Sequence, residues 1–180
     1  MPRERPQLVR PWNWLLISII IVGFDQLSKA WIRSYPEGHV IFKSSFLSII
    51  HVNNSGAAFG ILQDRSLLLT ITGFIGILVI LSFALLISRS TPLSLPKFGI
   101  IALGLVLGGT IGNLTDRLRY GHVTDFISVG FWPTFNIADS AVTIGIILFA
   151  YLILFSSGTA NRYFINSENN KDNHSSNVKR

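Results

Sequence analysis

Four long apolar runs constrain this chain more than any other feature of its sequence. They cover about residues 12–31, 67–87, 98–114 and 137–155. A helix needs about 20 residues to cross the ~30 Å hydrocarbon layer of a membrane, so each run is close to the required length. Hydrophobic residues make up 49% of the chain and charged residues only 13%, which leaves too little polar surface to cover a soluble fold. The predicted fold class is a membrane all-α four-helix transmembrane bundle.

Basic residues near the ends of the runs predict the orientation of the chain, because lysine and arginine are retained on the cytoplasmic side. Residues of this kind precede the first run, separate the second from the third and follow the fourth: Arg3, Arg5, Arg10, Arg89, Lys97, Arg162, Lys171, Lys179 and Arg180. The opposite side also carries basic residues, but an even number of spans places both termini together. We therefore expect a cytoplasmic N-terminus at residues 1–11, one four-span membrane domain at residues 12–156 and a disordered cytoplasmic tail at residues 157–180.

The two connections predicted to face outward are residues 32–66 and 116–136. The first contains "HVIFKSSFLSIIHV", whose mixture of β-branched, aromatic and serine residues favours short strands over helix. The second contains "FISVGFWPTF", a cluster of aromatic residues of the kind that lies at the headgroup level of a bilayer. Together they predict a small extracytoplasmic β-rich platform and an aromatic loop over the outer ends of the helices.

Composition and spacing exclude several classes of function. Cysteine is absent, which excludes disulfides, thiolate nucleophiles and cysteine metal sites. His51 and His122 do not form an HExxH-type pattern, and Ser55 does not lie in a G-x-S-x-G elbow. We predict neither a metal ion nor another cofactor. The net charge of +6 is not read as a nucleic-acid signal, so nucleic acid is not a predicted partner.

Ionisable residues in or near a span cost free energy and need an explanation. Asp25 and Lys29 stand four residues apart on one helix face, which predicts an intrahelical ion pair with Lys29 reaching toward the interface, or else a role beside a substrate. Asn113 and Asp116 are one helical turn apart. Arg117 follows Asp116 directly, which favours a structural ion pair or a network that fixes the loop.

Asp125 and Asp139 are the two acids that could perform chemistry. Asp139 is followed by a serine at a predicted helix start, which is also a common capping composition. Asp125 stands in an apolar stretch without an obvious cationic neighbour. Two carboxylates held close in a partly dry site do not both ionise easily, so one keeps a proton while the other accepts one from water. An aspartic protease uses this arrangement and needs neither cysteine nor metal.

Four segments resemble the lipoprotein signal peptidases (signal peptidase II), a family of bacterial inner-membrane aspartic endopeptidases. They are "DQLSK" at 25–29, "NNSGAAFG" at 53–60, "GGTIGNLTDRLRYGHVTDFI" at 108–127 and "FNIADSAVTIG" at 135–145. They occur in the family's order and cover parts of three spans and of both outward loops. The resemblance implies a multi-pass protein with both termini in the cytoplasm and an active site on the extracytoplasmic side.

The resemblance also implies roles for individual residues. Asp125 and Asp139 match the catalytic pair. Other matched positions bind substrate or support the site: Asp25, Lys29, Asn54, Gly56, Asn113, Asp116, Arg117, Asn136 and Ala138. Thr124 is a small departure, because the family often has an apolar residue before its catalytic aspartate, and Thr115 before Asp116 is another. The implied substrate is a prolipoprotein cleaved before a cysteine that carries diacylglyceryl, and the implied inhibitor is globomycin. Membrane lipids are further partners, and we expect a monomer.

Three alternatives remain open at this point. An intramembrane aspartyl protease of the presenilin or prepilin-peptidase kind would carry a G-x-G-D signature, which the sequence lacks. A small transporter would use Asp25, Asp125 and Asp139 as proton relays. A lipid-binding or assembly protein would use Asp139 as a helix cap and leave Asp125 facing water.

Overall fold

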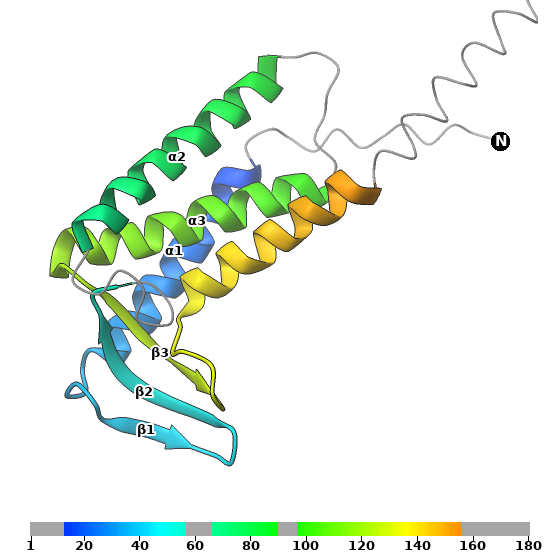
Figure 1. Ribbon diagram of the computed structural model, residues 1–180. Helices are drawn as coiled ribbons and strands as arrows, with labels where there is room; N and C mark the ends of the chain where they lie inside the picture. Colours follow the sequence, from blue (N-terminus) through cyan, green and yellow to red (C-terminus); the bar gives the residue numbers. More distant parts are fainter. Residues whose placement is uncertain (1–12, 57–65, 90–96, 156–180) are drawn as a thin grey trace, which may run out of the picture.

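The computed structural model describes residues 13–56, 66–89 and 97–155 (Figure 1). The predicted N-terminal segment, the predicted tail and residues 57–60 of the "NNSGAAFG" motif lie outside the described residues. The elements occur in the order α1, β1, β2, α2, α3 and β3, followed by a C-terminal helix that Figure 1 leaves unlabelled.

Four helices in the described part of the chain are long and apolar enough to cross a membrane. They are α1 at Asn13–Ile32, α2 at Ser66–Arg89, α3 at Lys97–Tyr120 and the C-terminal helix at Ile137–Phe155. The predicted membrane bundle is confirmed. The third helix continues six residues beyond the apolar run at 98–114, because its last turns carry polar and charged side chains, among them the buried Asp116, that a search for apolar residues does not include.

Helix α3 lies at the centre of the bundle, and its glycines allow the other helices to approach closely. A β-carbon added at Gly104 would lie 2.7 Å from Cβ of Ile17, and one added at Gly108 would lie 2.8 Å from Cβ of Ile21. The spacing of small residues thus permits the tight helix packing that the sequence predicts. At Gly112 the added atom would lie 2.6 Å from Oδ2 of Asp25, so the same approach brings the polar face of α1 against α3.

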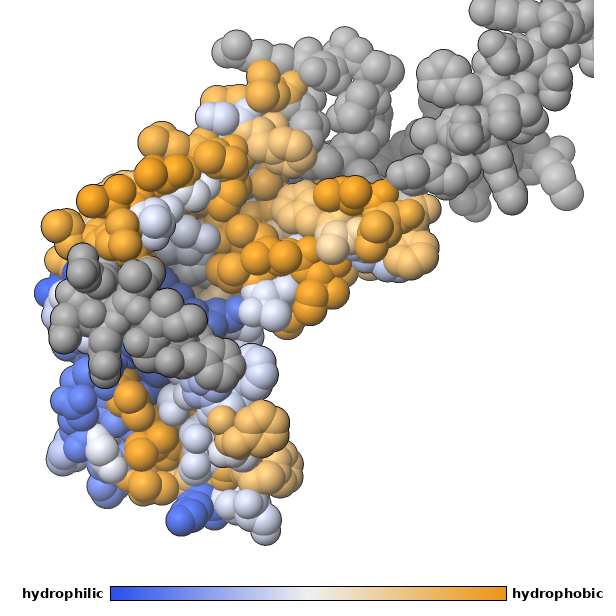
Figure 2. All heavy atoms as spheres, in the orientation of Figure 1, coloured by the Kyte–Doolittle hydropathy of each residue, from blue (hydrophilic) through white to orange (hydrophobic). Residues whose placement is uncertain are grey.

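The outer surfaces of the helices are apolar, as expected for contact with lipid. Only 6% of the apolar window in α2 is buried, compared with 56% of the window in α3. Large side chains such as Leu67, Leu78 and Leu86 of α2 are exposed. Figure 2 shows hydrophobic atoms over the helices and more hydrophilic atoms over the sheet. The protein is a multi-pass membrane protein.

Three antiparallel strands form a sheet at one end of the helices (Figure 1). Strand β1 is Val40–Lys43, β2 is Leu47–Asn54 and β3 is Val123–Val129, in the spatial order β1-β2-β3. The first outward connection forms strands as predicted. The second contributes β3, where the sequence indicated only an aromatic loop. Its pairing with β2 places Thr124 opposite Asn53 and Asp125 opposite Val52.

Candidate active site

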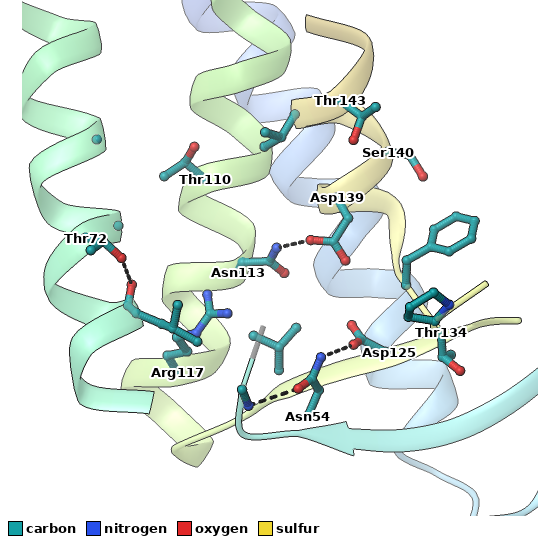
Figure 3. Close-up of a pocket in the computed structure, with 18 of the residues that line it drawn as sticks. Asn54, Thr72, Thr110, Asn113, Arg117, Asp125, Thr134, Asp139, Ser140 and Thr143 are labelled. Atoms are coloured by element: carbon teal, nitrogen blue, oxygen red, sulfur yellow. Dashed lines mark hydrogen bonds between the residues drawn. The ribbon is translucent and has the colours of Figure 1, made fainter. Parts of the chain in front are cut away.

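A cavity of about 910 Å³ lies where the sheet meets the membrane helices. Its polar lining includes Asn54, Asn113, Arg117, Asp125 and Asp139, which come from β2, α3, β3 and the C-terminal helix. The rest of the lining is more apolar and includes residues of α2. In Figure 3 the carboxyl groups of Asp125 and Asp139 both point into this space. The structure therefore brings together the two acids that the sequence proposes as a catalytic pair.

Asp125 lies on β3 and is only 2% exposed. Its Oδ2 accepts a hydrogen bond of 2.8 Å from Nδ2 of Asn54, and its Oδ1 accepts one of 2.7 Å from Nδ2 of Asn136. Burial raises the pKa of the Asp125 carboxyl to about 7, and the nearby charge of Asp139 adds to the shift. The neutral form of Asp125 is thus well populated near neutral pH.

Asp139 lies in the first turn of the C-terminal helix, but it is not the residue that caps that helix. Asn136 is the cap, because its Oδ1 accepts a hydrogen bond of 3.0 Å from the backbone N–H of Asp139. In return Oδ2 of Asp139 accepts one of 3.2 Å from the N–H of Asn136, which completes a reciprocal capping box. The other carboxylate oxygen, Oδ1, accepts a 2.7 Å bond from Nδ2 of Asn113.

Asn136 links the two acids. Its Nδ2 group donates to Oδ1 of Asp125 and, at 3.1 Å, to Oδ1 of Asn113, while its side-chain oxygen accepts from Asp139. The residue is fully buried. Within the described residues, no basic side chain forms an ion pair within 4.0 Å of either cavity carboxylate. The hydrogen bonds that reach the two carboxylates come from amide groups.

A buried ion network supports the site from the side of α1 and α3. The ammonium group of Lys29 lies 2.9 Å from Oδ2 of Asp25, 3.2 Å from Oδ2 of Asp116 and 2.9 Å from Oδ1 of Asn113. The predicted ion pair of Asp25 and Lys29 is confirmed. Lys29 does not reach toward the interface, however, because its side chain is fully buried and its charge is compensated inside the bundle.

Asp116 does not pair with Arg117, its neighbour in sequence. Adjacent residues on a helix point in directions about 100° apart, so Asp116 faces α1 while Arg117 lines the cavity. The partners of Asp116 are Lys29 and Arg33, whose Nη1 lies 3.4 Å from Oδ1. The loop-fixing alternative was closer to the structure, since Oδ2 of Asp116 also accepts a 3.1 Å bond from the N–H of Thr124.

The remaining proposed site residues shape the walls of the site. Gly56 donates its N–H to Oδ1 of Asn54 at 2.9 Å, which fixes the direction in which the amide of Asn54 faces Asp125. Ala138 is fully buried, and its N–H donates to Oδ1 of Asp25 at 3.0 Å. Each of these residues thus orients a polar side chain of the site.

Sequence reasoning missed the roles of Gln26 and Arg33. Nε2 of Gln26 lies 3.1 Å from Oδ1 of Asp116 and 3.1 Å from the carbonyl of Gly112. Its place beside Asp25 in "DQLSK" was the available signal. Arg33 lies in the first outward connection, outside the four segments that carry the resemblance. Within the described ranges, no group of three or more histidine or acidic side chains could hold a metal ion.

Comparison with known proteins finds relatives in sequence and in structure. A sequence model of the signal peptidase (SPase) II family matches residues 17–155. A lipoprotein signal peptidase of Dehalococcoides mccartyi is 46% identical over 74% of this chain and 83% of its own length. Another, of Moorella thermoacetica, is 36% identical over 83% of this chain and 97% of its own length.

A solved structure described as a bacterial membrane enzyme superimposes with a TM-score of 0.71, at 33% identity, over 83% of this chain and 90% of that one. The family match at residues 17–155 contains the last three membrane helices, all of α1 except its first four residues, the sheet and both cavity acids. The chain therefore belongs to the signal peptidase II family of membrane peptidases.

Proposed function

We propose that this protein is an aspartic endopeptidase that removes the signal peptide from diacylglyceryl-modified prolipoproteins by cleaving just before the lipidated cysteine. The observation that carries the proposal is the convergence of Asp125 and Asp139 in one cavity, where both are bonded to Asn136. The two acids come from separate elements and accept hydrogen bonds from amide groups, and within the described residues neither forms an ion pair, which suits the sharing of one proton.

The surroundings of the two acids suggest different roles. Asp125 holds the proton, because burial favours its neutral form at pH values up to about 7. Asp139 is the base, because its two oxygens accept N–H groups at the start of a helix, where the dipole stabilises an anion. Asp139 takes a proton from water as the water attacks the scissile carbonyl, and Asp125 polarises the carbonyl oxygen. No covalent intermediate with the protein forms.

The lining of the cavity suits a substrate that is part peptide and part lipid. Residues from the membrane helices supply apolar or small surface on one side, including Leu69, Gly73, Val142 and Ile144. The sheet side supplies polar groups, with Arg117 available to contact an oxygen of the substrate. A precursor could therefore present its peptide bond to the acids while its acyl chains stay in the membrane.

The proposed location is the bacterial inner membrane, with the sheet and the cavity on the extracytoplasmic side. The basic residues that precede the first span and follow the last support cytoplasmic termini. We further propose that residues 12–156 carry the whole activity, that the enzyme acts as a monomer and that it needs neither a cofactor nor nucleic acid.

A proton-relay transporter is less well supported than a peptidase. Such a path would have to include Asp25 together with the cavity acids. Both oxygens of Asp25 are instead engaged, one by Lys29 and the other by the N–H of Ala138. This favours a structural role for Asp25.

Cleavage by purified protein, reconstituted in lipid, tests the proposed function. Asp125→Asn and Asp139→Asn are each expected to lower turnover of a diacylglyceryl-modified precursor by about 10³-fold or more, because each removes a proton-transferring group. Glu37→Gln makes the same chemical change at an exposed carboxylate that precedes β1 and accepts a hydrogen bond from Asn53, and it should retain activity.

Mass spectrometry should find a product that begins at the lipidated cysteine, and globomycin should suppress its formation. The proposal fails if either cavity variant, shown to be folded by its thermal unfolding, processes the precursor at the wild-type rate. It fails equally if the wild type prefers the precursor without its lipid.

A further inference from the structure

The face of strand β3 that points away from the cavity contacts a basic residue, Arg33, that the proposed mechanism does not use. Side chains alternate between the two faces of a strand, so Thr124 points away from the cavity while Asp125 points into it. Thr124 is fully buried, and its hydroxyl oxygen accepts a hydrogen bond of 3.1 Å from Nη1 of Arg33. Arg33 directly follows the last residue of α1, so this contact joins a membrane helix to the strand that carries Asp125.

Thr124 is anchored at three of its atoms. Besides the hydroxyl contact, its backbone N–H donates to Oδ2 of Asp116 at 3.1 Å, and its carbonyl oxygen makes a longer contact of 3.5 Å with Nδ2 of Asn136. The hydroxyl contact fixes the side chain in addition to the backbone. The residue next to Asp125 is therefore held by α1, α3 and the start of the C-terminal helix together.

Arg33 is itself fixed in place. Its guanidinium carbon lies 4.6 Å from the centre of the Tyr120 ring, and Nη1 also lies 3.4 Å from Oδ1 of Asp116. A planar guanidinium that stacks on an aromatic ring while it donates in its own plane has little freedom to turn. Arg33 can thus act as a rigid support for the hydroxyl of Thr124.

The strand needs such a support because its pairing with β2 is irregular at this point. The register of the two strands shifts between Ile49 and Val52, and Val52 is the partner of Asp125. A register shift bends a strand and disrupts its ladder locally, so pairing alone fixes the backbone of Asp125 less well than a regular ladder would.

We propose that Arg33 and Thr124 are positioning residues, which set the place of the Asp125 carboxyl relative to Asp139 by holding β3 from behind. This inference rests on the proposed function, because it assigns meaning to the position of a carboxyl that does the chemistry. Neither residue touches the cavity.

The test measures kcat and KM for Thr124→Val, Thr124→Ser and Arg33→Gln on the lipid-modified precursor. Valine keeps the shape and burial of threonine but removes the hydroxyl. A displaced reacting group is costly, so Thr124→Val is expected to lower kcat about ten- to a hundredfold. KM should change by less than about twofold, because substrate contacts remain. Serine restores the hydroxyl and should recover most of the lost kcat.

Thr115→Val is the matched control, because it deletes a hydroxyl that is bonded within α3, to the carbonyl of Ile111. It should leave kcat unchanged. Arg33→Gln changes a side chain that is 19% exposed and should reproduce the loss seen with Thr124→Val, even if the valine variant proves too unstable to assay. If Arg33 acts through the hydroxyl, adding Arg33→Gln to Thr124→Val should lower kcat by less than about a further twofold.

Wild-type kcat in Arg33→Gln, equal losses in the serine and valine variants, or fully multiplicative losses in the double variant would each overturn the inference. Asp125→Asn is assayed beside them. If it is inactive while Arg33→Gln and Thr124→Val are unimpaired, only the positioning role is wrong. If Asp125→Asn is active, the proposed function itself is wrong.

Discussion

Two pairs of acidic residues lie at the sheet end of the helices, and they differ in their partners. Asp25 and Asp116 form ion pairs with the same ammonium group, that of Lys29. Within the described residues, the hydrogen bonds that reach Asp125 and Asp139 all come from amide groups. An ion pair stabilises the charged carboxylate, whereas amide donors in a buried site leave the neutral acid accessible. The first pair is suited to hold structure and the second to exchange a proton.

The two pairs are connected by asparagine side chains whose directions are fixed. Lys29 donates to the side-chain oxygen of Asn113, which leaves the NH2 group of Asn113 to face Asp139. The lysine that pairs with Asp25 and Asp116 thereby orients the amide group that donates to Asp139. Substitutions of Asp25, Asp116 or Lys29 should therefore act mainly on stability. Substitutions of Asp125 or Asp139 should act mainly on turnover.

The largest effect on stability is expected from Lys29→Met. Methionine fills a similar volume but leaves Asp25 and Asp116 buried without their shared cation, and removing one partner of a buried ion pair costs about 3–5 kcal/mol. Thermal unfolding in detergent measures the loss. Lys43→Met, at an exposed position of β1, is the control and should unfold like the wild type. A Lys29→Met protein of wild-type stability would contradict the structural role of this pair.

A smaller effect is expected from Asp25→Asn. Lys29 keeps Asp116 and Asn113 as partners in this variant, so the free energy of unfolding should fall by about 1.5–3 kcal/mol, the contribution of a hydrogen bond to a charged group. Cleavage should fall less than in either cavity variant. The comparison of the two pairs breaks down if Asp25→Asn unfolds at the wild-type temperature yet has no activity.

The membrane helices and the pairing of Asp25 with Lys29 could be predicted from the sequence because both depend on local spacing. Hydropathy counts apolar residues within one run, and residues four apart on a helix are neighbours by geometry. The close approach of α1 to α3 was predictable for the same reason, from the repeat of Gly104, Gly108 and Gly112. The aspartate pair was singled out because Asp125 had no structural explanation.

Strand β3 could not be predicted because its hydrogen-bond partner lies far away in the sequence. Thr124 is opposite Asn53 in the sheet, and no local pattern announces that pairing. The choice of Lys29 and Arg33 as partners of Asp116 depends on the same long-range packing. The sequence favoured Asp139 over Asn136 as the cap because an aspartate also suits that position, but Asp139 lies three residues beyond the cap.

The pH dependence of kcat/KM tests most directly whether Asp125 and Asp139 share a proton. Asp125 must be protonated for turnover, and its pKa of about 7 lies above the ordinary value for an aspartate, so the active fraction is high below pH 7 and falls above it. With a precursor that has no ionisable group near the cleaved bond, kcat/KM should fall about tenfold per pH unit above pH 7. Thermal unfolding at each pH confirms that the protein stays folded. A flat profile from pH 6 to about pH 9 would contradict the assignment of Asp125 as the proton donor.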